Sequence, residues 1–148
     1  MTSWIMKVIR TILTPKFIGI VGVFYTVALI TVCFLKFEDL EKVNFSYADK
    51  VFHALTYFVL TLIWFFQYYT SKKVKDINLS KLLLLITVLL IFGMVIEILQ
   101  LVLTDYRSFD WIDFLADAVG IFSAAILLVL TKTRLKEFKS QILNTRYR

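Results

Sequence analysis

The stretch EILQLVLTDYRSFDWIDFLADAVG, residues 97–120, ends one long apolar run and begins the next, so it decides how the chain is organised. It carries five acidic residues within 21 positions: Glu97, Asp105, Asp110, Asp113 and Asp117. Three of these, Glu97, Asp113 and Asp117, lie inside the apolar runs themselves. A carboxylate in a hydrocarbon environment is costly, so these side chains must be neutralised or put to use.

The whole chain is apolar for its length. Of its 148 residues, 59% are hydrophobic, and the mean hydropathy is +0.79. About 20 helical residues cross the hydrocarbon core of a bilayer, and four apolar runs have 19–22 residues: Phe17–Leu35, Val51–Tyr69, Leu82–Leu103 and Trp111–Thr131. Backbone polar groups in lipid must be satisfied within the segment, which helices achieve. The sequence therefore predicts an all-α protein, a four-span transmembrane helical bundle.

The basic residues predict the orientation of the bundle, because lysine and arginine are enriched on the cytoplasmic side. Thirteen of the 17 basic residues fall in the N-terminal segment, the second loop and the C-terminal tail. This pattern predicts a cytoplasmic or interfacial segment at 1–16, a membrane domain at 17–131 and a basic cytoplasmic tail at 132–148. The net charge of +6 follows from the same bias, so no nucleic-acid partner is expected.

Both terminal segments show amphipathic patterns. Near the N-terminus one helical face would hold Trp4, Ile5, Val8, Ile9 and Ile12, and Pro15 is expected to end that helix. In the tail, Leu135, Phe138 and Ile142 recur at helical spacing. Two interpretations stay open: helices lying on the membrane surface, and solvated helices packing on the protein's own spans.

Polar residues of three spans are predicted to converge at the outer side. The second span would begin there with Asp49, Lys50, His53 and Tyr57, and the third would end there with Glu97 and Gln100. The fourth would begin there with Asp110, Asp113, Asp117 and Gly120 on one helical face. At 1.5 Å per residue, these side chains would lie within roughly 10 Å of the outer boundary.

This convergence has two interpretations. Ionisable residues inside spans face the protein interior and usually mark a site, which favours a polar pocket. The alternative is a clasp that fixes the register of the helices, in which Lys50, Arg107 and His53 neutralise the carboxylates. In either case Tyr57 is expected to donate a hydrogen bond within the network.

Several chemistries find no support in the sequence. The single histidine excludes an HExxH zinc motif, no serine lies in a GxSxG setting, and Cys33 has no basic neighbour to activate it. His53, Glu97, Asp113 and Asp117 could ligate a metal, but their spacing is a weak signal, so no metal and no cofactor are predicted. Acid/base chemistry by a carboxylate is allowed, although no motif specifies it.

Three segments resemble the VanZ-like family of bacterial membrane proteins: DKVFHALTYF (Asp49–Phe58), EILQ (Glu97–Gln100) and RSFDWIDFLADAVG (Arg107–Gly120). The family pattern is D-K-x-x-H-x-x-x-Y, then E-x-x-Q, then R-x-x-D-x-x-D-x-x-x-N-x-x-G. This chain departs from it at Asp117, where the family has Asn, and at Asp105-Tyr106, where Pro-Gly is frequent. The resemblance covers about residues 45–130.

The resemblance implies a multi-pass protein of the bacterial inner membrane and a site that includes the matching residues. The family's namesake is linked to low-level resistance to teicoplanin. The preferred function is therefore a non-catalytic envelope protein that binds a lipid headgroup, a wall-precursor group or a glycopeptide-related ligand at the outer leaflet. Lys50 and Arg107 would hold an anionic group, and the carboxylates would hold an amine or hydroxyls.

Two further functions stay open. One is a non-catalytic accessory subunit of a larger inner-membrane complex, in which the polar network stiffens the bundle. The other is an acid/base enzyme that acts on a lipid-linked substrate through Glu97 or Asp113. The expected partners are membrane lipids and a larger membrane complex or further copies of the chain.

Overall fold

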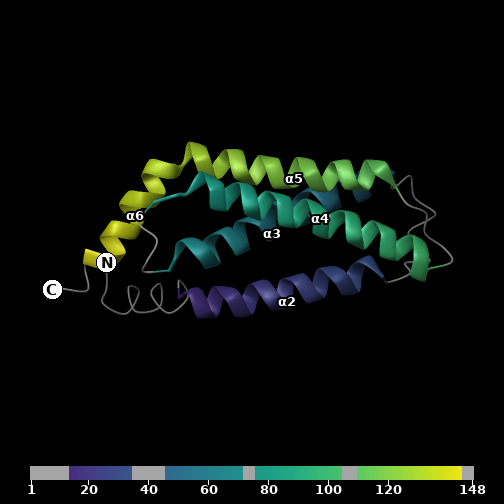
Figure 1. Cartoon of the computed structure of the whole chain (residues 1–148), viewed down its shortest axis with the longest axis horizontal. Helices are drawn as coiled ribbons and strands as arrows, with labels where there is room; N and C mark the ends of the chain where they lie inside the picture. Colours follow the sequence, from purple (N-terminus) through teal and green to yellow (C-terminus); the bar gives the residue numbers. More distant parts are fainter. Residues whose placement is uncertain (1–13, 35–45, 72–75, 105–109, 145–148) are drawn as a thin grey trace.

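The computed structural model describes residues 14–34, 46–71, 76–104 and 110–144. These residues form helices only (Figure 1): α2 (Pro15–Cys33), α3 (Ser46–Tyr69), α4 (Leu79–Leu103), α5 (Trp111–Leu130) and α6 (Lys132–Asn144). Helices α2 to α5 are long and apolar enough to cross a membrane. The predicted all-α fold with four spans is confirmed. The largest difference in a boundary is at α3, which begins five residues before its apolar run because its first turn is polar.

Local capping explains where three of the spans begin. The hydroxyl of Thr14 accepts a hydrogen bond from the backbone N–H of Phe17, and Pro15 occupies the first helical position, where its missing N–H is harmless. Asn78 caps α4, and Asp110 caps α5 by accepting from the N–H of Ile112 at 2.8 Å. Pro15 thus begins a span, and the expected N-terminal amphipathic helix lies outside the described residues.

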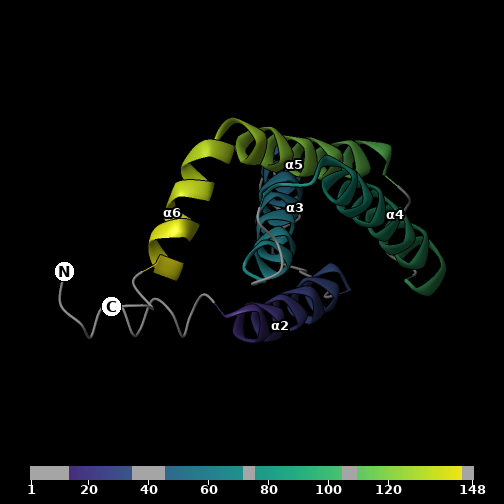
Figure 2. The same ribbon diagram turned by 60° about the vertical axis from the view of Figure 1, so that its left-hand side comes forward.

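Helix α3 is the centre of the bundle. It packs most extensively against α5 and next against α2, while α4 lies against α5 and α3 (Figure 2). Gly120 permits the contact between α3 and α5, because a Cβ atom there would lie 2.0 Å from the carbonyl oxygen of Ala54. The two spans that carry most of the predicted polar residues are therefore in backbone contact.

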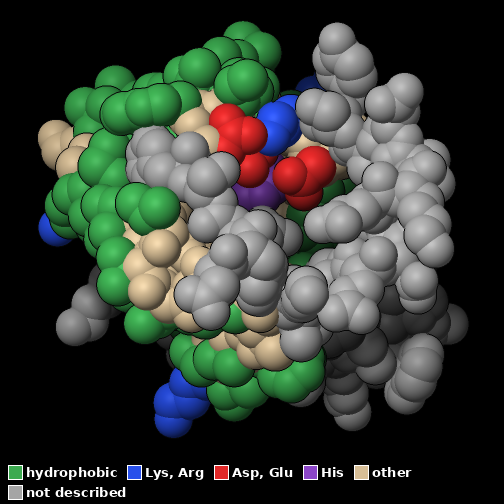
Figure 3. Space-filling view, turned by 90° about the vertical axis from the view of Figure 1, so that its right-hand side faces the viewer, with side chains coloured by type: hydrophobic (Ala, Val, Ile, Leu, Met, Phe, Trp, Pro, Cys, Tyr) green, Lys and Arg blue, Asp and Glu red, His purple; other side chains and the backbone are tan. Residues whose placement is uncertain are grey.

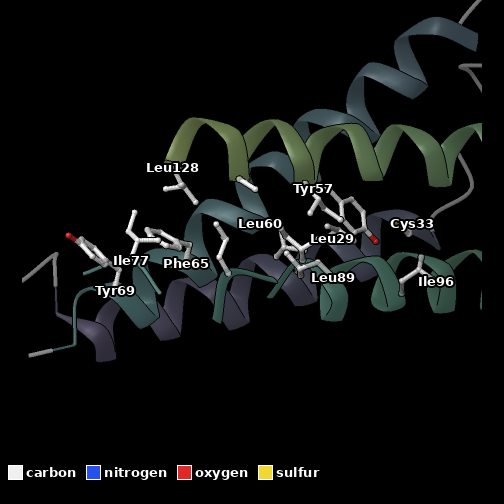
Figure 4. Close-up of a cluster of buried hydrophobic side chains, with 14 residues drawn as sticks. Leu29, Cys33, Tyr57, Leu60, Phe65, Tyr69, Ile77, Leu89, Ile96 and Leu128 are labelled. Carbon is white, nitrogen blue, oxygen red and sulfur yellow. The ribbon is translucent and has the colours of Figure 1, made fainter. Parts of the chain in front are cut away.

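The interior is apolar over most of its length. Leu60, Ile121 and Leu128 are fully buried there, together with Leu29 of α2 and Leu89 of α4 (Figure 4). The outward faces carry exposed large apolar side chains such as Phe24 and Leu130. Such faces suit a lipid environment, where exposing an apolar side chain carries no penalty.

The bundle has two chemically different ends. At one end, helices α2 and α4 begin and helices α3 and α5 end (Figure 1). We call this the basic end, because it carries Lys16, Lys81, Lys132, Arg134, Lys136 and Lys139. The opposite end, which we call the polar end, holds the start of α3, the end of α4 and the start of α5. The start of the first span and the end of the last lie on the same side, as the prediction of two cytoplasmic termini requires.

Helix α6 turns away from α5 and packs on the basic end (Figure 2). The ammonium of Lys139 donates to the backbone carbonyls of Tyr69 and Ser71 and lies over the Tyr69 ring, and Leu135 packs against the core. Phe138 is half exposed, and the side chain of Ile142 is outside the described part of the chain. Of the two interpretations of the tail, packing on the protein's own spans accounts for the observed contacts.

Candidate polar site between α3, α4 and α5

Nine of the ten predicted site residues are described, and all nine are at the polar end. Helix α3 carries Asp49, Lys50, His53 and Tyr57, α4 carries Glu97 and Gln100, and Asp110 caps α5, which carries Asp113 and Asp117. The tenth, Arg107, lies outside the described residues. Figure 3 looks onto this end and shows acidic side chains grouped around a basic side chain and the histidine.

Lys50 lies among three carboxylates. Its ammonium is 2.7 Å from Asp110 Oδ2 and 3.9 Å from Asp49 Oδ2, and it forms a short contact with Asp113 Oδ1. The proximity of Lys50 lowers the pKa of the Asp110 carboxyl, and the backbone N–H of Ile112 adds to this effect. Lys50 therefore links the N-terminal part of α3 to the start of α5, as the clasp interpretation proposed.

His53 and Asp117 form a second, deeper pair. His53 Nδ1 lies 3.0 Å from Asp117 Oδ1, and both side chains are buried. The exposed fraction of the carboxylate side chains falls from 44% at Asp49 and 37% at Asp110 to 2% at Asp117. The side chains around Lys50 are therefore partly exposed, and those around His53 are buried. We call the first group, Asp49, Lys50 and Asp110, the mouth of the site, and the second group, His53, Glu97 and Asp117, its interior.

Glu97 is the residue of α4 that lies in the interior of the site. Its side chain is buried, and its only hydrogen bond with described residues is a long one, 3.5 Å, from the backbone N–H of Asp110. A bond of that length is weak. Glu97 is therefore a buried carboxylate whose charge no described lysine or arginine side chain contacts.

Tyr57 differs from its expected role. Its hydroxyl is buried, yet it has no hydrogen-bond partner among the residues that the structure describes. The prediction that Tyr57 donates a hydrogen bond to another residue of the polar network is therefore wrong as far as the described residues are concerned. Figure 4 shows its oxygen at the end of the apolar core nearest Cys33 and Ile96, which is the polar end.

Gly93 is a site residue that the sequence analysis missed. A Cβ atom at this position would lie 3.0 Å from Asp117 Oδ2 and 3.3 Å from Tyr57 Oη. Gly93 is one helical turn before Glu97 and so lies on the same face of α4. That spacing was the available signal, since a glycine one turn from a buried acid allows other side chains to approach the helix.

Gln100 is buried at the polar end but takes a different partner. Its side-chain amide donates to the backbone carbonyl of Cys33 at 2.8 Å. This carbonyl belongs to the last turn of α2, where carbonyls lack intrahelical donors. Gln100 therefore ties α4 to the end of α2 and serves as a packing contact.

The balance of charge determines which groups the site can accept. Five carboxylates, those of Asp49, Glu97, Asp110, Asp113 and Asp117, face one ammonium and one imidazole in the described structure. Because Lys50 already contacts three of these carboxylates, it is not available to an anionic ligand. The arrangement favours cations and hydrogen-bond donors, so the expected role of Lys50 in holding an anionic group finds no support.

A separate cavity of about 430 Å³ lies between α3 and α4 near the basic end. Its lining includes Trp64, Phe65, Lys81, Leu85 and Val88, and it contains none of the predicted site residues. Its walls are largely apolar. The polar cluster and this cavity are therefore different features of the bundle.

Comparisons with protein-family models, with curated protein sequences and with solved structures gave no match for this chain. The fold and the composition define its class by themselves. The protein is a four-span helical integral membrane protein with a multi-pass topology.

Proposed function

We propose that this protein is a VanZ-like, non-catalytic protein of the bacterial cell envelope that binds an amine-bearing and hydroxyl-bearing group of a lipid or a cell-wall precursor. The polar end would face the outer leaflet of the inner membrane, in agreement with the enrichment of lysine and arginine at the opposite end. The observation that carries the proposal is the excess of carboxylates, graded from an exposed mouth to a buried interior.

The chemistry of the mouth fits an amine better than a phosphate. An ammonium group can donate to Asp49 and Asp110, whose side chains are partly exposed and share a single cation, Lys50. Charge-assisted hydrogen bonds contribute about 1.5–3 kcal/mol each. Two such bonds give only weak binding in water, so retention would also depend on the apolar part of a lipid-linked ligand.

The resemblance to the VanZ-like family supports the same proposal. Asp49, Lys50 and Asp110 match the family pattern, and they form the mouth. Asp117 is one of the two departures from that pattern, and it adds a carboxylate where the family has an amide. This chain would therefore have a more negative site than its relatives and a stronger preference for cationic groups.

Native mass spectrometry of the protein extracted gently from its own membrane tests the proposal. We expect a retained amine-bearing lipid or precursor that is lost in Asp110→Asn, which keeps the cap of α5, and kept in Asp76→Asn, a matched change at the basic end. Retention in both variants would place the ligand elsewhere and overturn the proposal.

Two other outcomes would replace the proposal with an alternative. A larger protein at fixed stoichiometry, with no small molecule, would favour the accessory subunit, and the acids would then act as a clasp. A retained lipid-linked molecule that is chemically converted by the wild-type protein and not by Glu97→Gln would favour the enzyme.

A further inference from the structure

Three buried side chains from three different helices meet behind the mouth of the site. His53 of α3, Glu97 of α4 and Asp117 of α5 each place one potential ligand atom within 4.8 Å of the other two. All three are buried, at 6%, 2% and 2% exposure. Donor atoms of a tetrahedral zinc site with bonds of 2.0–2.2 Å are roughly 3.3–3.6 Å apart, so shifts of about 1 Å would close this trio around an ion.

Tyr57 gives an independent reason to expect a ligand here. Its buried hydroxyl has no partner among the described residues, and leaving such a group unsatisfied is costly. The hydroxyl oxygen and Asp117 Oδ2 flank the same point beside Gly93, at 3.3 Å and 3.0 Å. The unpartnered hydroxyl thus lies beside the carboxylate of Asp117, one of the three potential ligands.

Charge makes a divalent cation the best complement to the trio. Glu97 and Asp117 together carry two negative charges when ionised, and a protonated His53 would offset only one of them. A 2+ ion held by a neutral imidazole and two carboxylates leaves no net charge in the buried site. The mixture of one nitrogen and two oxygens suits Zn²⁺ or Mn²⁺ better than Ca²⁺ or Mg²⁺, which prefer oxygen alone.

A second trio at the polar end is a poorer candidate. Asp49, His53 and Asp113 also place potential ligand atoms within 4.8 Å of one another. However, the ammonium of Lys50 contacts Asp113 and lies 3.9 Å from Asp49. A fixed positive charge beside two of the three ligands opposes a second cation, so the deeper trio is favoured.

We propose that His53, Glu97 and Asp117 bind one divalent transition-metal ion, Zn²⁺ or Mn²⁺, with the Tyr57 hydroxyl hydrogen-bonded to a ligand of that ion. This site shares no ligand residue with the ligand site at the mouth. Its ligands come from three separate helices, so the metal would also fix the packing of α3, α4 and α5.

Metal binding is measured on the full chain in lipid nanodiscs, purified on a tag without histidine and stripped with a chelator. Titration with Zn²⁺ and elemental analysis should give one ion per chain. Glu97→Gln should weaken Zn²⁺ binding at least tenfold, whereas Asp49→Asn, the matched change in the other trio, should weaken it much less because Asp49 is partly exposed. Tyr57→Phe should weaken binding about tenfold, the usual effect of losing an outer hydrogen bond.

A spectroscopic experiment keeps the proposal testable if a variant fails to fold. The chain has one histidine, so a nitrogen coupling from ¹⁵N-histidine to bound Mn²⁺ in pulsed electron paramagnetic resonance identifies His53 without a mutation. The proposal is overturned by the absence of this coupling together with absent stoichiometric Zn²⁺. It is equally overturned if Asp49→Asn abolishes binding while Glu97→Gln leaves it intact.

Discussion

Gly120 of α5 is the position where one methyl group tests the central packing of the bundle. A Cβ atom there would lie 2.0 Å from the carbonyl oxygen of Ala54, 2.9 Å from its carbonyl carbon and 3.0 Å from the backbone nitrogen of Phe58. All three atoms belong to the backbone of α3, so no side-chain rotation can relieve the clash. Helices α3 and α5 must separate by more than 1 Å or shift in register to accept alanine.

The expected cost of Gly120→Ala follows from this geometry. Overpacking usually costs about 1–3 kcal/mol, and a clash with backbone belongs at the upper end, so we expect about 3 kcal/mol. That cost outweighs the gain of about 1 kcal/mol from placing alanine in a helix. For a chain of this length the unfolding midpoint should fall by on the order of 10 °C.

The assay uses the protein's own chemistry. Cys33 is the sole cysteine and is buried, so reaction with a fluorogenic maleimide on heating reports unfolding. Gly19→Ala is the matched control, because a Cβ at Gly19 would lie 3.6 Å from the Gln67 side chain, an ordinary contact, and should leave the midpoint unchanged or slightly higher. Equal midpoints for the two variants would refute the close approach of α3 and α5.

Three shorter predictions concern the two ends of the bundle. Lys50→Met should lower the free energy of unfolding by about 3 kcal/mol in the maleimide assay, because the nearly buried carboxylate of Asp113 loses its ammonium partner. Adding Asp113→Asn should restore part of the loss, and no recovery in the double variant would contradict the pairing. Gln100→Leu should cost about 1–3 kcal/mol, because the hydrogen bond between α4 and α2 is lost, and an unchanged midpoint would contradict that role. The backbone N–H of Ile77 and two lysines of α6 lower the pKa of Asp76 in the folded protein. The contacts of the ionised Asp76 therefore stabilise the fold above the unfolded pKa of about 4, and this stabilisation is lost as the pH falls through the lower pKa of the folded state. Hydrogen exchange in α6 should therefore rise in acid, and the same rise in Asp76→Asn would show another cause.

The spans were predictable because their signal is local. Runs of about 20 apolar residues identify helices without knowledge of their neighbours. Three helix starts moved outward where a polar turn or a cap extends the helix, as at Thr14 and Asn78, and α2 and α5 end one or two residues before their apolar runs do. The depth of the polar residues was predictable for the same reason, since 1.5 Å per residue fixes distance from a span end. The positions of the spans and the depths of their polar residues together predict that the polar turns of α3 and α5 lie at the same end of the bundle.

The pairing within the site was not predictable, because it depends on how each helix is rotated about its axis. Sequence spacing could not decide that Lys50 contacts Asp113 while His53 contacts Asp117. It also could not show that Gln100 turns to the carbonyl of Cys33, because that partner is a backbone group on another span. The lack of a hydrogen-bond partner for the Tyr57 hydroxyl among the described residues likewise results from packing.

Binding of either proposed ligand should weaken binding of the other, because both are attracted by the negative charge of the same cluster of carboxylates. At the mouth, an incoming amine competes with Lys50, which is tethered beside the same carboxylates and therefore has a high effective concentration. In the interior no described ammonium contacts Glu97 or Asp117, so a divalent ion meets no such competitor.

A metal ion in the interior would cancel two charges and make the mouth less attractive to a cation. Coupling free energies between sites are typically 1–3 kcal/mol, so saturating Zn²⁺ should weaken binding of a short-chain phosphatidylethanolamine by roughly 5–150-fold. The measurement is the lipid affinity with and without Zn²⁺, and Glu97→Gln should abolish the difference. An affinity that Zn²⁺ leaves unchanged or increases would show that the mouth and the interior do not share their charge.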